Sequence, residues 1–535
     1  MESWVYALPV RLLVLAILIG WTFLLGKRAV FRETHPRFSG QTAVGISLGL
    51  FVLIRLLYLP DREQNVDTGT WIATAITVGK ASDPLYTLLT SSDGRPLGVL
   101  PLALLEMAGI PLEYASIDLL GVLIWCLTLW LFRRLIIRFL PEETATCLIW
   151  LPILLLSTIW YHDFASFNTE ITGNLWLMLG IFGLERLSSK SGKMALFLGF
   201  WLGCLPFVKF QTVPMGLVFG LFAVWKLYRI GRIGALAGLL GGAVVPVLLL
   251  TVYFASRNDL ESFWGDYFSN YFVYSYTTEY SSLSGWERFS PVRIGRYLFH
   301  SYKVAGFWLA LFLAMLFGSG RLFRLPLKTG QRERFWLAVS WWTASLYAVL
   351  QAGNNYPHYQ LFLFFPSLFL LAVLLEINVL STTRRMLFLS LGLALAQAAV
   401  NTVYRAPLPV HPGEPVFRQL TSEIQNRTQP NESVVVWGYL DRLHVYARRP
   451  MGYRSSNTFW VYSPTSTQPY RIRQFLGDLQ QNRPRLFVDA LSHRLAPFSD
   501  QAYRFERIPA INAYIREHYR LIKTVEDVRI FERRE

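Results

Sequence analysis

The chain has 535 residues, of which 53% are hydrophobic and only 16% charged, and its formal net charge is +16. A soluble protein carries about 25% charged residues, so this composition excludes an ordinary soluble protein. Much of the positive charge lies in short loops between apolar runs, and the rest lies near the C-terminus. That distribution favours contact with membrane lipids over binding of nucleic acid.

Apolar runs follow one another from the N-terminus to about Tyr404, and most approach the roughly 20 residues needed to cross a bilayer core. We therefore predict a mainly α-helical, polytopic membrane protein with about 12 transmembrane helices and a transmembrane domain over residues 1–404. The predicted spans are approximately 4–25, 41–59, 116–132, 144–160, 171–185, 194–208, 211–225, 233–254, 304–320, 335–352, 360–378 and 386–404.

Every odd-numbered loop between these spans is short and rich in Lys and Arg. Arg133, Arg134 and Arg138 fill the third loop, for example, and the residues from Arg321 to Arg334 fill the ninth. Because such loops stay in the cytoplasm, the even-numbered loops and the C-terminal segment are predicted to face the opposite side of the membrane.

Two of the outward loops are long. The loop from about Asp61 to Tyr114 contains Thr68–Gly79 and Val99–Met107, which are apolar or amphipathic enough to lie along the membrane surface. The loop from Ser256 to about Tyr302 is crowded with aromatic residues. Such residues either form a belt among lipid headgroups or bind a sugar or a lipid, and the sequence leaves both alternatives open.

Residues 405–535 have no membrane span and form a predicted outward-facing, soluble α/β domain. Their pattern predicts short strands alternating with helices. The strands are Ser433–Trp437, Arg485–Ala490 and a closing pair over Tyr519–Arg533, and the helices are Leu440–Ala447, Pro469–Gln481 and Ile508–Glu517. The three cysteines all fall in apolar runs, so there is no disulfide framework and no cysteine-type metal site.

Ionisable residues stand beside or inside several spans, where a charge is costly and is therefore a functional hypothesis by default. They are Arg55, Asp67, Asp163, Glu170, Lys209 and His358. Lys209 stands alone where two apolar runs meet. Asp61 and Glu63, which follow the second span, are interpreted as solvated loop charges.

A carboxylate that can deprotonate a hydroxyl, facing cations that can hold a phosphate, is what glycosyl transfer from a phosphorylated lipid requires. The carboxylate activates the acceptor, and the cations stabilise negative charge on the departing phosphate. Nucleotide sugars are made in the cytoplasm, so an active site on the outer face would take its donor from a lipid carrier.

The order of several short motifs resembles the GT-C superfamily of membrane glycosyltransferases, in the branch of protein O-mannosyltransferases and lipid A aminoarabinose transferases. In the first outward loop the matching positions are Asp67-Thr68-Gly69, Asp83-Pro84-Leu85-Tyr86 and Gly94-Arg95-Pro96-Leu97, with Thr68 where the family has a second acid. Further matches are Asn168-Thr169-Glu170, Val208-Lys209-Phe210-Gln211, Pro357-His358-Tyr359-Gln360 and, in the tail, Trp437-Gly438 and Arg448-Arg449-Pro450.

The resemblance implies a GT-C fold and an inverting transferase in a bacterial inner (plasma) membrane. Such an enzyme moves a sugar from a polyprenyl-phosphate donor to a hydroxyl of a glycan, lipid or protein acceptor, in contact with membrane lipids. Asp67 would be the base, and Glu170 would assist it or bind the sugar or a divalent cation. Lys209, His358 and Arg55 would hold the phosphate.

Asp163 and Tyr359 are further candidates for substrate binding. The alternative functions are a multi-pass transporter and a non-enzymatic scaffold for envelope assembly. Transporters tend to show paired halves, and no such symmetry is visible in this sequence. The enzyme hypothesis requires Asp67, Glu170 and Lys209 around one outward cavity.

Overall fold

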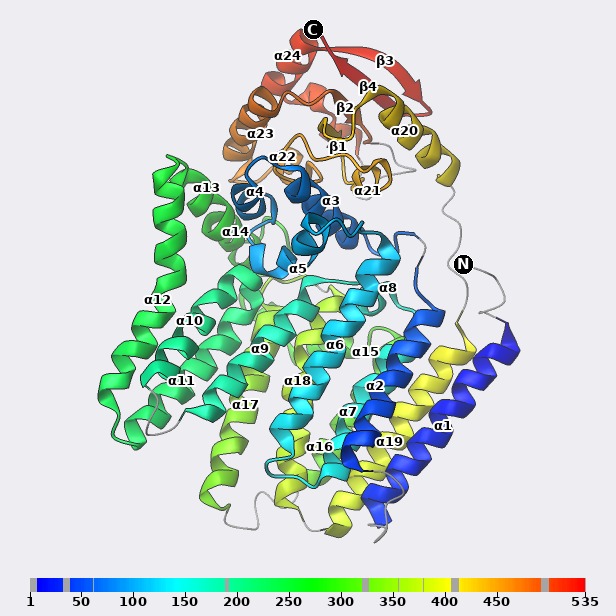
Figure 1. Ribbon diagram of the computed structural model, residues 1–535, viewed down its shortest axis with the longest axis vertical. Helices are drawn as coiled ribbons and strands as arrows, with labels where there is room; N and C mark the ends of the chain where they lie inside the picture. The colour runs from blue at the N-terminus through cyan, green and yellow to red at the C-terminus, as the bar shows by residue number, and fades with distance from the viewer. Residues whose placement is uncertain are drawn as a thin grey trace. The chain divides into compact units, whose positions relative to one another are not determined.

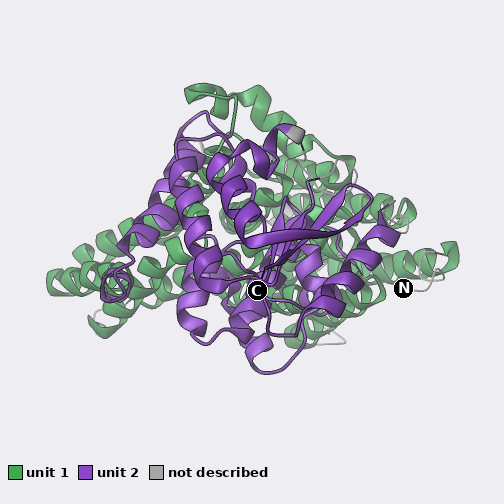
Figure 2. Ribbon diagram, turned by 90° about the horizontal axis from the view of Figure 1, so that it is seen from above, with its two compact units in different colours: residues 1–60, 118–250, 281–407 green, residues 61–117, 251–280, 408–535 purple. Residues whose placement is uncertain are grey.

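The computed structural model describes residues 7–31, 39–60, 62–187, 192–319, 327–354, 356–378, 380–405, 413–491 and 500–534 (Figure 1). The chain divides into two compact units, each assembled from three separate stretches of sequence (Figure 2). The first unit comprises residues 1–60, 118–250 and 281–407, and the second comprises residues 61–117, 251–280 and 408–535.

The first unit is a bundle of helices. Its long helices are α1 (Leu8–Phe31), α2 (Gly40–Leu57), α6 (Tyr114–Ile136), α7 (Glu142–Thr158), α9 (Thr169–Arg186), α10 (Gly192–Val208), α11 (Val213–Arg229), α12 (Ile233–Ser256), α16 (Tyr302–Ser319), α17 (Thr329–Leu350), α18 (Leu361–Ile377) and α19 (Leu380–Val403). Shorter pieces join them: α8 (His162–Ala165), η2 (Phe210–Thr212), η4 (Gly285–Phe289), α15 (Pro291–Phe299) and η5 (Pro357–Gln360).

Each predicted span coincides with one of these long helices. Among the described residues, eight helices are long and apolar enough to cross a membrane by length and composition. The other four predicted spans correspond to α7, α9, α10 and α17; α7 and α10 have 17 residues each, and α9 and α17 begin with polar turns. The prediction of a polytopic, mainly α-helical membrane protein is therefore confirmed.

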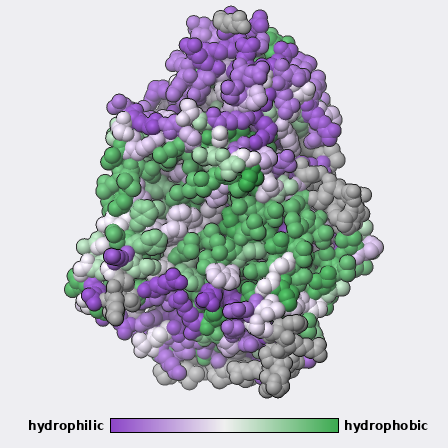
Figure 3. Space-filling model, viewed as in Figure 1, coloured by the Kyte–Doolittle hydropathy of each residue, from purple (hydrophilic) through white to green (hydrophobic). Residues whose placement is uncertain are grey.

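Large apolar side chains are exposed along several helices of the first unit. Phe23 on α1, Leu221 on α11 and Leu249 on α12 are 60% exposed or more. Figure 3 shows hydrophobic side chains gathered over much of the displayed face. Because soluble proteins rarely expose apolar surfaces of this extent, these helices are suited to contact with lipid. In contrast, α18 is almost wholly buried and packs against α7, α9, α16 and α17.

The second unit combines short helices from two loops with an α/β segment. The loops provide α3 (Val66–Lys80), α4 (Pro84–Ser91), α5 (Pro96–Met107), α13 (Leu260–Trp264), η3 (Gly265–Ser269) and α14 (Asn270–Tyr276). The C-terminal segment provides α20 (Glu414–Arg427), β1 (Val434–Trp437), α21 (Arg442–Ala447), α22 (Phe459–Tyr462), α23 (Gln468–Asn482), β2 (Leu486–Asp489), η6 (Gln501–Tyr503), η7 (Phe505–Arg507), α24 (Pro509–His518), β3 (Tyr519–Val525) and β4 (Val528–Arg533).

The four strands form one sheet in the order β1-β2-β4-β3, in which β1 and β2 are parallel and the other pairs are antiparallel. Alternate residues of β1 face opposite sides of this sheet, as the period of a strand requires. Val434 and Val436 pack with α20 and α21, whereas Val435 and Trp437 pack with α23 and α24. The strands and helices predicted for this segment are confirmed to within a few residues, and α20 was not predicted.

The aromatic residues of the second long loop divide between the inside and the outside of the second unit. Phe263 and Tyr267 are buried and pack on Phe254. Trp264 and Phe272 are more than half exposed. The buried rings therefore belong to the core of the unit, whereas a lipid belt or a sugar-binding role remains a prediction for the exposed ones.

Candidate functional site

A buried ion pair lies at the centre of the candidate site in the first unit. The ammonium group of Lys209 donates hydrogen bonds to the Glu170 carboxylate and to Thr169 Oγ1, the latter at 3.1 Å. Lys209 is 2% exposed and Glu170 is fully buried. Because isolated charges in such surroundings are very costly, each group stabilises the ionised form of the other.

Helix ends place both members of this pair. Lys209 is the extended residue between α10 and η2, and its carbonyl oxygen accepts a hydrogen bond from Thr212 Oγ1. Glu170 lies in the first turn of α9. A carboxylate there is favoured by the unpaired N–H groups and the positive end of the helix dipole. The end of α10 and the start of α9 thus bring the opposite charges of the Lys209 and Glu170 side chains together.

His358 extends this cluster. Its Nδ1 lies 2.9 Å from Asp163 Oδ1, and its Nε2 lies 3.7 Å from Glu170 Oε1. Burial disfavours the Asp163 carboxylate, but the hydrogen bond and the charge of His358 outweigh burial and lower the pKa of Asp163. The Lys209 Nζ also lies 5.1 Å from the centre of the Tyr359 ring. Five of the predicted site residues, Asp163, Glu170, Lys209, His358 and Tyr359, therefore lie together.

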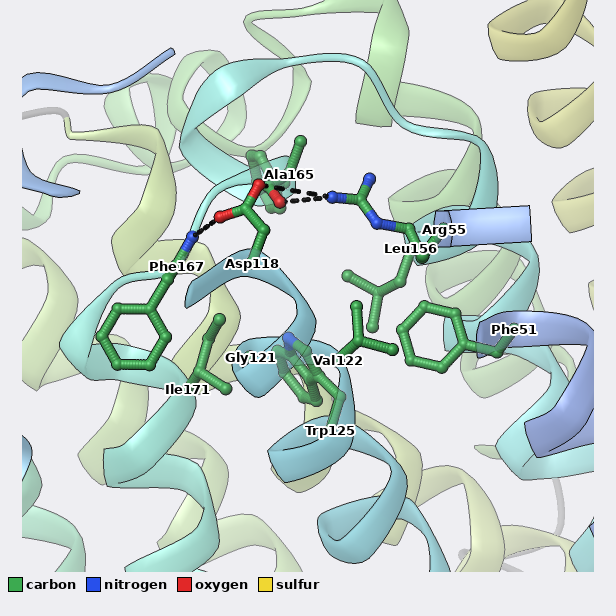
Figure 4. A pocket seen from close by; sticks show the side chains of 11 residues that line it. Phe51, Arg55, Asp118, Gly121, Val122, Trp125, Leu156, Ala165, Phe167 and Ile171 are labelled. Carbon is green, nitrogen blue, oxygen red and sulfur yellow. Dashed lines mark hydrogen bonds and ion pairs between the residues drawn. The ribbon is translucent and has the colours of Figure 1, made fainter. Parts of the chain in front are cut away.

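Arg55 has a different set of partners. Its Nη2 donates to the Ala165 carbonyl oxygen at 2.6 Å and lies 3.9 Å from Asp118 Oδ2, and Asp118 Oδ1 accepts from the Phe167 N–H at 2.8 Å (Figure 4). These side chains line a small pocket at the end of α2 and the start of α6. Arg55 and Asp118 therefore fix the loop that carries Asp163 into α9; phosphate binding by Arg55 stays a prediction.

Asp67 belongs to the second unit, at the start of α3. The Asn65 side chain caps this helix and accepts the Asp67 N–H at 2.9 Å. The Asp67 carboxylate accepts a hydrogen bond from the hydroxyl group of Tyr439, with 3.0 Å between Oδ1 and the phenol oxygen. Tyr439 follows β1, so a residue of the C-terminal segment contacts the predicted base.

A second contact joins the same two segments. Thr70, one turn along α3, donates its hydroxyl hydrogen to the carboxylate of Asp441, which also accepts from Asn457 Nδ2 at 3.2 Å. A Cβ atom on Gly69 would lie 2.9 Å from Glu63 Oε1 and 3.3 Å from Asp441 Cβ. Glycine at this position thus permits the close approach of α3 to α21.

The interpretation of Glu63 as a solvated loop charge is wrong. Its side chain is only 11% exposed, and its Oε2 lies 3.5 Å from Arg442 Nε. Burial raises the pKa of Glu63 to about 7, although Arg442 opposes this shift. Asp61 lies outside the described residues.

No group of three or more His, Cys, Asp and Glu side chains among the described residues is arranged to hold a metal ion. The sequence reasoning missed Asp118, Tyr439 and Asp441. Asp118 is a single charged residue in an apolar run, and Lys209 was identified by the same kind of signal. Tyr439 and Asp441 follow the carboxyl end of a strand in a parallel pair, where α/β proteins commonly place functional residues.

The helices, the buried charges and the α/β segment define a polytopic membrane protein. No protein-family model and no curated protein sequence matches the chain. Among solved structures it is similar to ArnT from Cupriavidus metallidurans bound to undecaprenyl phosphate, with a TM-score of 0.53, 13% identity and coverage of 92% of this chain and 98% of ArnT. The apo state of ArnT gives a TM-score of 0.52 at 14% identity, with the same coverage. The chain therefore has the fold of ArnT, which is the GT-C fold.

Proposed function

We propose that this chain is a membrane glycosyltransferase that transfers a sugar from a polyprenyl-phosphate donor to an acceptor hydroxyl on the outer face of a bacterial inner membrane. The observation that carries the proposal is the buried Lys209–Glu170–His358 cluster. Buried ionisable groups in a membrane domain are kept for a function, and these can receive a phosphate. The GT-C fold supports the same conclusion, and ArnT with this fold has been solved with undecaprenyl phosphate bound.

In the proposed reaction the oxygen of the acceptor hydroxyl attacks the anomeric carbon of the donor sugar. Asp67 takes the proton from that hydroxyl as general base. The bond between the anomeric carbon and the phosphate oxygen breaks, and the polyprenyl phosphate leaves with the electron pair. Lys209 and His358 stabilise the negative charge on this leaving group. One displacement inverts the anomeric centre.

Glu170 keeps Lys209 charged before the donor binds, because the ion pair offsets the cost of burying the ammonium group. Asp163 holds the His358 ring through Nδ1. Its Nε2 lies 3.7 Å from Glu170 Oε1, so the ring presents this atom to the same carboxylate that pairs with Lys209. Arg55 and Tyr359 complete the set of substrate-binding candidates.

The test uses the purified full-length protein with undecaprenyl phosphate carrying mannose, glucose, galactose or aminoarabinose, and bacterial membranes as the source of acceptor. We expect one donor to lose its sugar at a rate that rises with protein concentration. The matched control is Asp67→Asn. Equal loss of the sugar with wild type and Asp67→Asn, or no loss with any donor, would contradict the proposal.

A further inference from the structure

Tyr439 and Asp441 of the C-terminal segment both contact the first turns of α3, where Asp67 lies. The phenol of Tyr439 donates to Asp67, and the carboxylate of Asp441 accepts from Thr70. Both residues lie on the short connection between β1 and α21. One connection therefore places a hydrogen-bond donor and a negative charge beside the proposed base.

The connection itself is held firmly. Gly438, with φ of 125°, has a conformation that other residues rarely adopt, and a Cβ atom there would lie 3.3 Å from the Ala490 carbonyl carbon. The Gly438 N–H donates to Thr458 Oγ1 at 2.9 Å. Trp437, the last residue of β1, is fully buried in the core. A rigid support of this kind is what a precisely placed functional group requires.

We propose that Tyr439 and Asp441 are positioning residues for Asp67, so that the C-terminal segment completes the catalytic centre. This inference rests on the proposed function. Tyr439 orients the Asp67 carboxylate and stabilises its ionised form through the hydrogen bond. Asp441 fixes the start of α3 through Thr70. The negative charge of Asp441 disfavours the ionised form of the Asp67 carboxylate, which is opposite to the effect of Tyr439.

The protonation of Tyr439 is consistent with this role. Burial, with the nearby charges of Asp67 and Asp441, raises the pKa of Tyr439 well above its ordinary value. The phenol therefore stays protonated and can donate its hydrogen bond to Asp67. Other charged groups also act on Asp67. They are Glu63 with its partner Arg442 and Asp93 with its partner Arg95. All of them remain in the variants described below, so the differences between variants isolate Tyr439 and Asp441.

The test measures the pH dependence of kcat with the undecaprenyl-phosphate sugar that wild type consumes fastest. Tyr439→Phe removes only the hydroxyl group. Because the ionised carboxylate loses a donor, we expect the acidic limb of the profile to move up by about one pH unit. Burial raises the pKa of Asp441 to about 6, so above that pH Asp441→Asn removes a neighbouring negative charge, and the part of the acidic limb above pH 6 should move to lower pH. These opposite displacements would not follow from a general loss of stability.

Tyr462→Phe is the matched control. Tyr462 is a buried tyrosine of the same segment, and within the described part of the chain its hydroxyl group has no hydrogen-bond partner. The pH profile of kcat for Tyr462→Phe should therefore coincide with that of wild type. If Tyr439→Phe and Asp441→Asn also kept the wild-type limb in an active enzyme, the inference would be wrong while the proposed function stood. A wild type that consumes no donor would overturn both.

Discussion

Lys209 and Glu170 form an ion pair in which both side chains are almost completely buried. Removing one partner takes the ion-pair partner away from a charge that stays buried. We expect Lys209→Met to lower the free energy of unfolding by about 3–5 kcal/mol and to abolish donor binding. Thermal unfolding in detergent and binding of undecaprenyl phosphate measure the two effects.

The double variant Lys209→Met/Glu170→Gln separates stability from function. It contains no lone buried charge, so its unfolding temperature should recover towards that of wild type. Its donor binding should stay lost because the cation is absent. Wild-type affinity in either variant would show that Lys209 is purely structural.

Asp67→Asn preserves the size of the side chain and its contact with Tyr439 but removes the base. We expect turnover to fall by roughly two to four orders of magnitude, with donor affinity unchanged. Glu261→Gln is the control, because Glu261 pairs with Arg473 in a mostly exposed contact of the same unit. Full activity of Asp67→Asn would mean that another residue is the base.

The buried carboxyl group of Glu63 predicts a dependence of stability on pH. Its pKa is raised from 4.5 to about 7, chiefly by burial, so the folded protein binds this proton more tightly than the unfolded chain does. The resulting stabilisation is complete below pH 4.5 and is lost as the pH rises through 7. Glu63→Gln cannot ionise and should therefore lose less stability between pH 5 and pH 8.

The measurement compares unfolding temperatures of wild type and Glu63→Gln at both pH values. Asp441, whose pKa burial raises to about 6, contributes in the same direction and remains in both proteins. The prediction concerns the difference between the two pH values, and the pKa of about 7 for Glu63 already includes the opposing effect of Arg442. Parallel curves for the two proteins would argue against it.

The basic loops predict which side of the membrane each segment faces. In a protein without native cysteines, a cysteine replacing the exposed Glu517 should react with a membrane-impermeant thiol reagent added to intact cells. A cysteine replacing the exposed Lys328 should react only after the cells are opened. The reverse pattern would invert the topology and would move the C-terminal segment to the cytoplasm.

Structural elements that are determined by residues close together in the sequence were predictable. The length of an apolar run predicts a span, and alternating short patterns predicted the strands of the C-terminal segment. Lys209 was visible because it is a single charge between two apolar runs. Its partners Glu170 and His358 were identified from their places beside spans, and the structure brings all three side chains together.

Features that depend on long-range packing were not predictable in this way. Tyr439 contacts Asp67 across 372 positions of the chain, and no local pattern encodes that distance. Glu63 stands in a polar stretch that resembles a solvated loop, and only the packing of Arg442 against it shows that it is buried. By contrast, the start of α20 carries a local signal, a proline in the first turn after Gly413.

The discontinuous second unit sets the order in which the protein can be completed during synthesis. Thr70 and Asp441 are separated by 371 positions, and at 5–20 residues per second the ribosome needs roughly 20 to 75 seconds to produce the second after the first. During that interval the newly made α3 can pack against α4 and α5, which follow it directly, but its contact with α21 is missing. A chain that stops before this segment would therefore lack the Tyr439 and Asp441 contacts around Asp67.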